Sequence, residues 1–260
     1  MMNILSVDWD FFFPDVIPLD WGHKESPLFI ESLWPIRAGN RNLLTKEKAI
    51  DTILPDKNLL NGFWERVIYQ PGLVYSLIIT ESHADISIIL KEDKKNVVVN
   101  FDQHHDILYR GRTIPKGDIP DCDYWAGWGI KYGYIKELHQ FYPEWRKQNP
   151  ESSDVNNLLP ELNTKRKHKI TVNYGLSSNY LPKIFGVVFI CRSGAWTPSW
   201  CDDKWLEFIS WWKKFPSIWD NKIILPYVLQ ERKPNLEEAI ELSKQWDKQY
   251  EEVMKWNQRS

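Results

Sequence analysis

Val97-Val98-Val99-Asn100-Phe101-Asp102-Gln103-His104-His105-Asp106 carries the clearest strand-and-turn signal in this chain. Its β-branched start predicts a short buried strand. The stretch then turns polar, with Asp102, His104 and Asp106 at every second position. Residues two apart in an extended segment point the same way, so two carboxylates and one imidazole would converge at the strand end. Carboxylates repel unless a cation or hydrogen bonds lie between them, so the pattern indicates a metal ion; a polar loop that caps the next helix is the alternative.

The types of side chain in this stretch narrow the choice of metal. Oxygen ligands with some imidazole suit Mn, Fe, Co or Zn, and the absence of thiolates argues against a structural Zn site. The cysteines, Cys122, Cys191 and Cys201, are widely spaced and odd in number. They form no zinc or disulfide pattern, which predicts a reducing, cytoplasmic location.

Two more hydrophobic segments end in the same kind of polar cluster. Residues 3–8 form an apolar run that leads into Asp8 and Asp10, and a charge on such a strand is costly unless it is paired. Turn formation or helix capping is the other interpretation of these aspartates. A third apolar run, residues 73–79, leads into Glu81 and His83. A single histidine of this kind is more often structural, but three polar strand ends in one chain favour a shared site.

The order of the expected elements predicts the fold class. Strands alternate with helices, which predicts an α/β fold with a mostly parallel sheet flanked by helices, and sites in such sheets form at the carboxyl ends of the strands. Further strands are expected at 170–174 and 184–191, and helices from Trp125 to about His139, from Asp202 to Trp212 and over 235–256. The last helix is amphipathic, and its Trp246, Tyr250 and Val253 are predicted to lie in the core.

Bulk properties exclude several classes of protein. The chain has 260 residues, enough for one large domain, with loop insertions expected near 14–45 and 146–168. A net charge of -2 excludes nucleic acid as an evident partner. The apolar runs are too short to span a membrane, and the N-terminus lacks the layout of a signal peptide. The sequence alone fixes no oligomeric state.

The three polar clusters together resemble a known site. The segments Ser6–Asp10, Glu81–His83 and Asp102–Asp106 are similar to the binuclear manganese site of the arginase/ureohydrolase superfamily. The Asp-x-Asp element comes first here, whereas it comes last in ordinary arginases. The resemblance therefore implies a trimmed and permuted arginase-like three-layer fold, with residues 1–260 as a single catalytic domain. This arrangement is similar to that of the small peptide arginases that act in the maturation of ribosomally synthesised, post-translationally modified peptides.

The resemblance also implies an activity and a ligand set. The expected enzyme is a manganese-dependent hydrolase that converts arginine in a precursor peptide to ornithine and releases urea. It would bind two Mn²⁺ per chain, and water activated between them would attack the guanidinium carbon. One ion is expected at Asp8, His83, Asp102 and Asp106, and the other at Asp8, Asp10, Asp102 and His104, with Asp8 and Asp102 as bridges.

Expectations for the substrate are less direct. Glu81 is the candidate partner of the guanidinium group, and His105 or His139 are candidates for proton transfer. Acids in the loop at Asp118, Asp121 and Asp123 could attract a cationic peptide, or they could be solvated turn residues. Aromatic side chains are expected to wall the site, which suits an internal arginine better than the free amino acid: Trp21, Trp34, Tyr124, Trp125, Trp128, Trp196 and Trp200.

Three other functions remain open from the sequence. A metal-dependent amide hydrolase of the deacetylase kind shares the implied fold but uses a single Zn. A small-molecule ureohydrolase, such as an arginase or agmatinase, would share both metals. A binding module with a structural acidic cluster would show no turnover.

Overall fold

A computed structural model of the chain describes residues 2–14, 25–39, 50–68, 74, 76–92, 95–109, 113–115, 119–150, 155, 162, 168–176, 181–182, 184–214 and 222–257. These residues form a seven-stranded sheet with the order β5-β4-β3-β1-β6-β2-β7. Every neighbouring pair is parallel. The strands are β1 (Asn3–Asp8), β2 (Ser76–Thr80), β3 (Asn96–Phe101), β4 (Ile135–Tyr142), β5 (Lys169–Tyr174), β6 (Val187–Cys191) and β7 (Lys222–Ile224).

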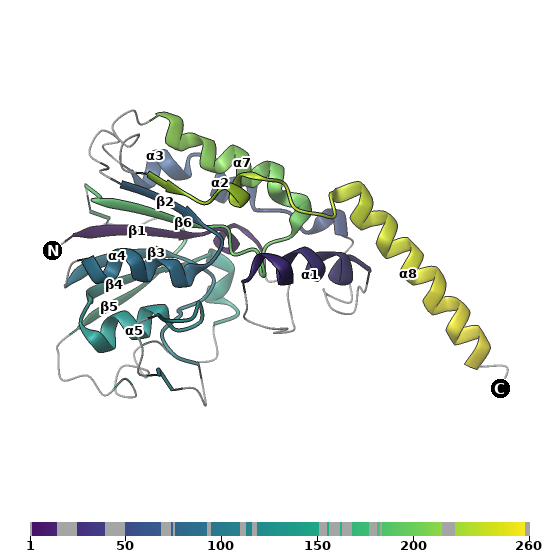
Figure 1. The fold of residues 1–260 in the computed structure, drawn as a ribbon, viewed down its shortest axis with the longest axis horizontal. Helices are drawn as coiled ribbons and strands as arrows, with labels where there is room; N and C mark the ends of the chain where they lie inside the picture. The colour runs from purple at the N-terminus through teal and green to yellow at the C-terminus, as the bar shows by residue number, and fades with distance from the viewer. Residues whose placement is uncertain are drawn as a thin grey trace.

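Helices flank the sheet, and the predicted α/β class is confirmed (Figure 1). The described α-helices are α1 (Pro27–Gly39), α2 (Lys57–Leu60), α3 (Phe63–Val67), α4 (Ser87–Glu92), α5 (Trp125–Tyr132), α7 (Asp202–Ile209) and α8 (Leu236–Asn257). Short 3₁₀ turns occupy Trp9–Phe12, Ile50–Thr52, His83–Ile86, Glu144–Lys147, Ser199–Cys201, Ser210–Lys214 and Pro226–Leu229.

The alternation of side chains along the strands builds two cores, one on each face of the sheet. Leu5 and Val7 of β1 face a cluster that includes residues of α3 and α7. Ile4, which precedes Leu5 and points to the opposite side of the sheet, faces a cluster that includes residues of α4 and α5. Because helices cover both faces, the central strands are buried and mostly apolar, as their β-branched runs predicted.

The carboxyl ends of four strands meet at one edge of the sheet. Asp8 at the end of β1 pairs in register with Cys191 at the end of β6, and Cys191 pairs with Thr80 at the end of β2. β3 lies on the other side of β1 and ends at Phe101, opposite Val7. The polar segments that follow these strands are therefore neighbours, and α1 lies beyond this edge (Figure 1).

Two expected elements differ from the structure. Helix α1 lies inside the segment 14–45 that was expected to be a loop insertion, and 15–24 and 40–45 are outside the described residues. Helix α5 ends at Tyr132 instead of continuing to His139, because Gly133 adopts a left-handed conformation with φ 78°. The chain then forms β4, whose buried polar residues obscure the alternation expected of a strand. Most of 146–168 is also outside the described residues.

The C-terminal helix is confirmed, but its predicted role in the core is wrong. Asn235 caps α8 through its Oδ1, which accepts the Glu238 N–H at 2.9 Å, and the Glu238 carboxylate accepts the Asn235 N–H in return. The second half of α8 extends away from the sheet and its helices (Figure 1), where Trp246, Tyr250 and Val253 are exposed. Across the described residues, no helix has the length and apolar character needed to cross a membrane.

Candidate metal centre

The end of β1 turns sharply at its two aspartates. Asp8 is the last residue of the strand, and its Oδ1 accepts the backbone N–H of Asp10 at 2.9 Å. This bond starts the 3₁₀ turn and leaves Oδ2 of Asp8 to face the neighbouring strands. The capping role considered for Asp8 is therefore real, and it coexists with a place in the polar cluster.

Three carboxylates converge on one imidazole nitrogen. Nδ1 of His83 lies 3.1 Å from Asp8 Oδ2, 3.2 Å from Asp102 Oδ2 and 3.4 Å from Asp106 Oδ2. One N–H cannot serve three acceptors. Ligand atoms bonded at about 2.1 Å to one ion lie roughly 3.0 to 3.4 Å apart, the spacing seen here. The opposite ring nitrogen, Nε2, contacts Ser6 Oγ at 2.7 Å, the kind of bond that fixes a ligating histidine.

A second group adjoins the first and shares one carboxylate with it. Nδ1 of His104 lies 2.9 Å from Asp10 Oδ2 and 3.6 Å from Asp102 Oδ1. The two oxygens of Asp102 thus face two different histidines, His83 and His104. The groups Asp8–His83–Asp102 and Asp10–Asp102–His104 each bring their ligand atoms within 4.8 Å of one another. Asp102 belongs to both groups, whereas Asp8 belongs to the first group alone, and the expected bridging of two ions stays a prediction.

The electrostatics of the cluster favour cations. Burial, together with the neighbouring carboxylates, raises the pKa of Asp8, Asp10 and Asp106. Burial opposes protonation of His83 and His104, yet their carboxylate contacts raise the pKa of both rings.

Asp102 behaves differently from the other carboxylates. Burial would raise the pKa of Asp102, but its bonds to His104 and His83 hold it below the usual range. Two divalent ions would neutralise four buried carboxylates without protons, so the donor set fits a two-metal site.

Buried polar side chains that the sequence analysis missed hold the ligands in place. Asn100 Nδ2 donates to Asp102 Oδ2 at 3.3 Å and to Gln140 Oε1 at 3.0 Å. Gln140 Nε2 in turn donates to the carbonyl oxygen of His104 at 2.9 Å. Their signal in the sequence is a polar residue within an otherwise apolar strand, because such residues are buried only when they are paired.

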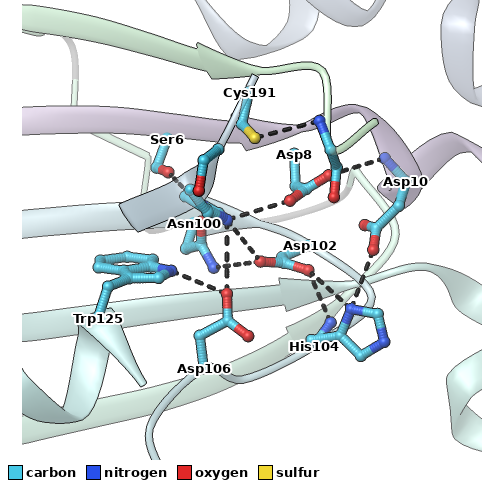
Figure 2. A network of polar contacts seen from close by, with 12 residues as sticks. Ser6, Asp8, Asp10, Asn100, Asp102, His104, Asp106, Trp125 and Cys191 are labelled. Atoms are coloured by element: carbon cyan, nitrogen blue, oxygen red, sulfur yellow. Dashed lines mark hydrogen bonds and ion pairs between the residues drawn. The ribbon is translucent and has the colours of Figure 1, made fainter. Parts of the chain in front are cut away.

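Asp106 is fixed from helix α5. Trp125 Nε1 donates to Asp106 Oδ2 at 2.8 Å (Figure 2), and the N–H groups of Ala126 and Gly127 donate to the Asp106 carbonyl oxygen. A Cβ at Gly127 would lie 1.8 Å from the carbonyl oxygen of Ile107. Only a residue without a side chain fits here, so Gly127 allows α5 to approach the segment that follows Asp106.

Glu81 is engaged by a partner within the protein. Its Oε2 accepts bonds from Arg192 Nε at 2.8 Å and Nη2 at 2.7 Å. Arg192 also lies 3.3 Å from Asp202, which binds Arg232 through several bonds. The four side chains form a buried chain of alternating charge, so the geometry does not favour Glu81 as the substrate's partner.

A second glutamate, which the sequence analysis missed, contacts the backbone of a residue of the cluster. Glu25 is half-buried; its Oε2 accepts the His83 backbone N–H at 3.3 Å, and its Oε1 accepts the Ser193 hydroxyl at 3.2 Å. Burial is the main cause that raises its pKa to about 7. No sequence signal marks Glu25, because it lies in a segment expected to be a loop and meets His83 only through the fold.

The candidates for proton transfer lie outside both ligand groups. Nδ1 of His105 accepts the Ile107 N–H, and its ring stacks on Tyr109. His139 is on β4, where its Nδ1 contacts Thr171 Oγ1 at 2.7 Å. Their proposed role in catalysis stays a prediction.

The loop acids divide into two kinds. Asp123 is buried, whereas Asp121 is exposed and accepts the Cys122 N–H through its Oδ1. Burial is the main cause that raises the pKa of the Cys122 thiol, and the charges of Glu25, Asp106, Asp121 and Asp123 act in the same direction. Asp118 is outside the described residues.

The aromatic wall expected around the site is much reduced. Trp34, Trp128 and Trp200 are buried and belong to the cores. Trp125 is buried too, but its ring centroid lies 4.7 Å from that of His83, so it does border the cluster. Trp196 is half-buried, and its ring centroid lies 5.3 Å from that of His104, at the partly exposed side of the cluster. Tyr124 is also half-buried, and Trp21 is outside the described residues.

Comparison of this chain with protein-family models, curated proteins and solved structures finds no match.

Proposed function

We propose that this protein is a manganese-dependent peptide arginase, which hydrolyses arginine residues of a ribosomally synthesised precursor peptide to ornithine and urea. The observation that carries the proposal is the position of Asp102. One carboxylate faces Nδ1 of His83 with one oxygen and Nδ1 of His104 with the other, as a bridge between two adjacent ions would. Single-metal hydrolases have no need of a second group built from Asp10 and His104.

The chain's own residues would hold two ions and keep them fixed. His83, Asp8 and Asp106 would bind one ion, Asp10 and His104 the other, and Asp102 both. When bound, two such ions supply Lewis acidity and a water of lowered pKa. Ser6, Asn100 and Trp125 hold the ligands through their hydrogen bonds. All four carboxylates are buried, which excludes bulk water from the charged cluster.

Substrate would approach from the side of His104 and Trp196. The His104 side chain is 26% exposed, whereas that of His83 is 2% exposed, so the second group is the accessible one. The half-buried Trp196 offers an aromatic face to a guanidinium group or a peptide backbone.

Glu25 is the better candidate to pair with the guanidinium. It is half-buried and beside His83, whereas the Glu81 carboxylate is held by Arg192. A planar guanidinium group suits a carboxylate because it can donate two parallel N–H bonds. Asp121, exposed nearby, would add attraction for a cationic peptide.

The test compares substrates at equal concentration. The full chain is loaded with Mn²⁺ and incubated with a peptide that contains an internal arginine, with free arginine and with agmatine. Urea release from the peptide, with the mass decrease of an arginine-to-ornithine conversion, is the expected result. Asp102→Asn is the matched control, since it replaces one oxygen by an amide of nearly the same shape.

Other outcomes would assign other functions. Equal turnover of free arginine would favour a small-molecule ureohydrolase. One Zn per chain with release of an acyl group from an amide would favour the deacetylase-like alternative. Full metal loading without turnover of any of these substrates would contradict an arginase.

A further inference from the structure

The end of β4 brings a basic and aromatic turn to the same edge of the sheet as the metal centre. β4 pairs with β3 in parallel as far as Phe101 and Phe141, so the segments that follow the two strands leave the sheet side by side. The metal-binding segment 102–106 follows β3, and the 3₁₀ turn Glu144–Lys147 follows β4. The proposed function does not yet use this turn.

Arg146 of this turn is fixed against the rim of the accessible ligand group. Its Nε donates to the carbonyl oxygen of Gln103 at 3.1 Å, and Gln103 immediately precedes His104. The backbone N–H of Gln103 in turn donates to Asp10 Oδ1 at 3.2 Å. The guanidinium carbon of Arg146 also lies 4.5 Å from the ring centroid of Trp145. One edge and one face of the guanidinium are therefore held beside the ligand group that substrate can reach.

The other edge of this guanidinium is unused. In the described part of the chain, Nη1 and Nη2 of Arg146 make no hydrogen bond, and no carboxylate pairs with them. The neighbouring Lys147 pairs with Glu144. The buried arginines Arg192 and Arg232, by contrast, are bonded through Nε and both Nη groups. Arg146 is half-buried and already oriented, so a partner for its free edge would cost little side-chain entropy.

An unpaired positive charge at this rim opposes the substrate of the proposed function. An arginine side chain carries the same charge as Arg146, and like charges that approach each other repel. A carboxylate on the substrate would neutralise Arg146 and remove the repulsion. The fork of parallel N–H groups in a guanidinium also matches the two oxygens of a carboxylate.

We propose that Arg146 binds a carboxylate of the substrate and so selects arginines that stand beside one. This inference rests on the proposed function, because it takes the ligand group of Asp10 and His104 as the side that substrate approaches. The carboxylate can come from two sources. One is an acidic side chain next to the arginine, and the other is an α-carboxylate, at the end of a peptide or in free arginine.

Matched peptides give the first test. The full chain, loaded with Mn²⁺, receives two end-blocked peptides whose internal arginine is flanked on both sides by aspartate or by asparagine. The aspartate peptide should have a kcat/KM about 10-fold higher, mainly through a lower KM, as expected for one charge-assisted bond. Arg146→Gln should remove this preference. Lys147→Gln is the matched control, because it removes a positive charge one residue away and should keep the preference. A merely structural role of Arg146 would lower the rates of both peptides together.

Two further pairs identify the source of the carboxylate. A peptide that ends in arginine is compared with its C-terminal amide, and free arginine is compared with agmatine, which lacks the carboxylate. A preference confined to the aspartate peptide assigns the acidic side chain. A preference for the free carboxylate in these two pairs, lost in Arg146→Gln, assigns the α-carboxylate. If free arginine is then the best substrate, Arg146 keeps its role and the peptide part of the proposed function fails.

Binding separates a failure of this proposal from a failure of the proposed function. Fluorescence anisotropy of the labelled aspartate and asparagine peptides gives their affinities whether or not urea is released. Equal affinities and rates within every pair, or a preference that Arg146→Gln retains, would overturn the role of Arg146 and leave the arginase proposal intact. An affinity difference that requires Arg146, with no urea from any substrate, would support the carboxylate site and contradict the arginase.

Discussion

Ser6 and His83, 77 residues apart in the chain, meet through a 2.7 Å contact between Ser6 Oγ and His83 Nε2. This contact turns the other ring nitrogen towards three carboxylates. The Ser6→Ala variant should lower affinity for the first metal ion by about 10- to 100-fold, the usual effect of losing a bond that orients a ligand. Competition with a chromophoric chelator measures the affinity. Ser243→Ala, on α8, is the control, and an unchanged affinity in Ser6→Ala would contradict the orienting role.

The shared carboxylate predicts an asymmetric pattern of metal loss. Asp102→Asn should reduce metal content at both positions, because each ion loses a ligand charge. Asp10→Asn should affect only the ion beside His104. Metal analysis after gel filtration gives the number of ions per chain.

For Asp8, the structure and the family resemblance predict different roles: a ligand of one ion, or a bridge between two. Its Oδ1 is used by the Asp10 N–H, and only Oδ2 faces His83. Asp8→Asn should therefore remove one ion and keep the other. Loss of both ions would show that Asp8 bridges, as the resemblance implies.

Replacing Glu25 or Glu81 by glutamine should affect different properties of the protein. Glu25→Gln should raise KM for an arginine peptide with metal content unchanged, and loss of a charge-assisted bond of about 1.5–3 kcal/mol corresponds to roughly a 10- to 100-fold increase. Glu81→Gln should mainly lower stability, since it leaves Arg192 underpaired. The exposed Glu31→Gln is the control. Equal KM values in Glu25→Gln and the parent protein would exclude Glu25 from substrate binding.

Asp202 holds the buried ion network together. It binds both Arg192 and Arg232, so Asp202→Ala would leave two buried guanidinium groups without one of their carboxylates. We expect a loss of about 3–5 kcal/mol in the free energy of unfolding, measured in urea. Asp203→Ala is a matched control, one residue away on α7 and 62% exposed. Similar losses in both variants would mean that the network is not what stabilises this region.

The metal-free protein should lose stability as pH rises. Carboxylate contacts raise the pKa of His83 and His104 above 6.5, although burial opposes this shift. A raised pKa in the folded state contributes stability that is fully present below the unfolded value and is lost as pH rises through the folded value. In chelator, the melting temperature should therefore fall as pH increases above about 6.5.

Added Mn²⁺ should reverse that trend. The ions displace protons from the same histidines and aspartates, so the gain in melting temperature on adding Mn²⁺ should increase with pH. Differential scanning fluorimetry with and without the metal checks both parts. A metal-free melting temperature that climbs over the same pH range would contradict them.

Much of the metal centre could be predicted from local sequence. The apolar strands that end at Asp8, at Thr80 and at Phe101 are visible as β-branched runs, and a parallel sheet puts such ends at one edge. Asp8, Asp10, His83, Asp102, His104 and Asp106 meet because the strands before them end at a common edge. The extended conformation expected of the alternating residues is wrong, since Asp10 lies in a 3₁₀ turn and the segment after Phe101 turns, with φ 47° at Asp106.

Other features depended on contacts between distant segments, which local patterns do not encode. Only the fold brings Arg192 to Glu81, and so takes that carboxylate away from a substrate, and only the fold brings Glu25 to His83. The second part of the helix expected up to His139 is the strand β4, which lies between β3 and β5, where its buried polar residues leave no clear alternation.

Helix α8 shows most simply which features depend on local sequence and which depend on the tertiary structure. The sequence by itself determined that α8 is a helix with one apolar face, since that depends on the spacing of residues along one element. Whether the face is buried depends on what lies opposite it. The tertiary structure covers Leu236 and Ala239 and leaves Trp246, Tyr250 and Val253 exposed, because burial is a property of two surfaces and the sequence pattern describes only one.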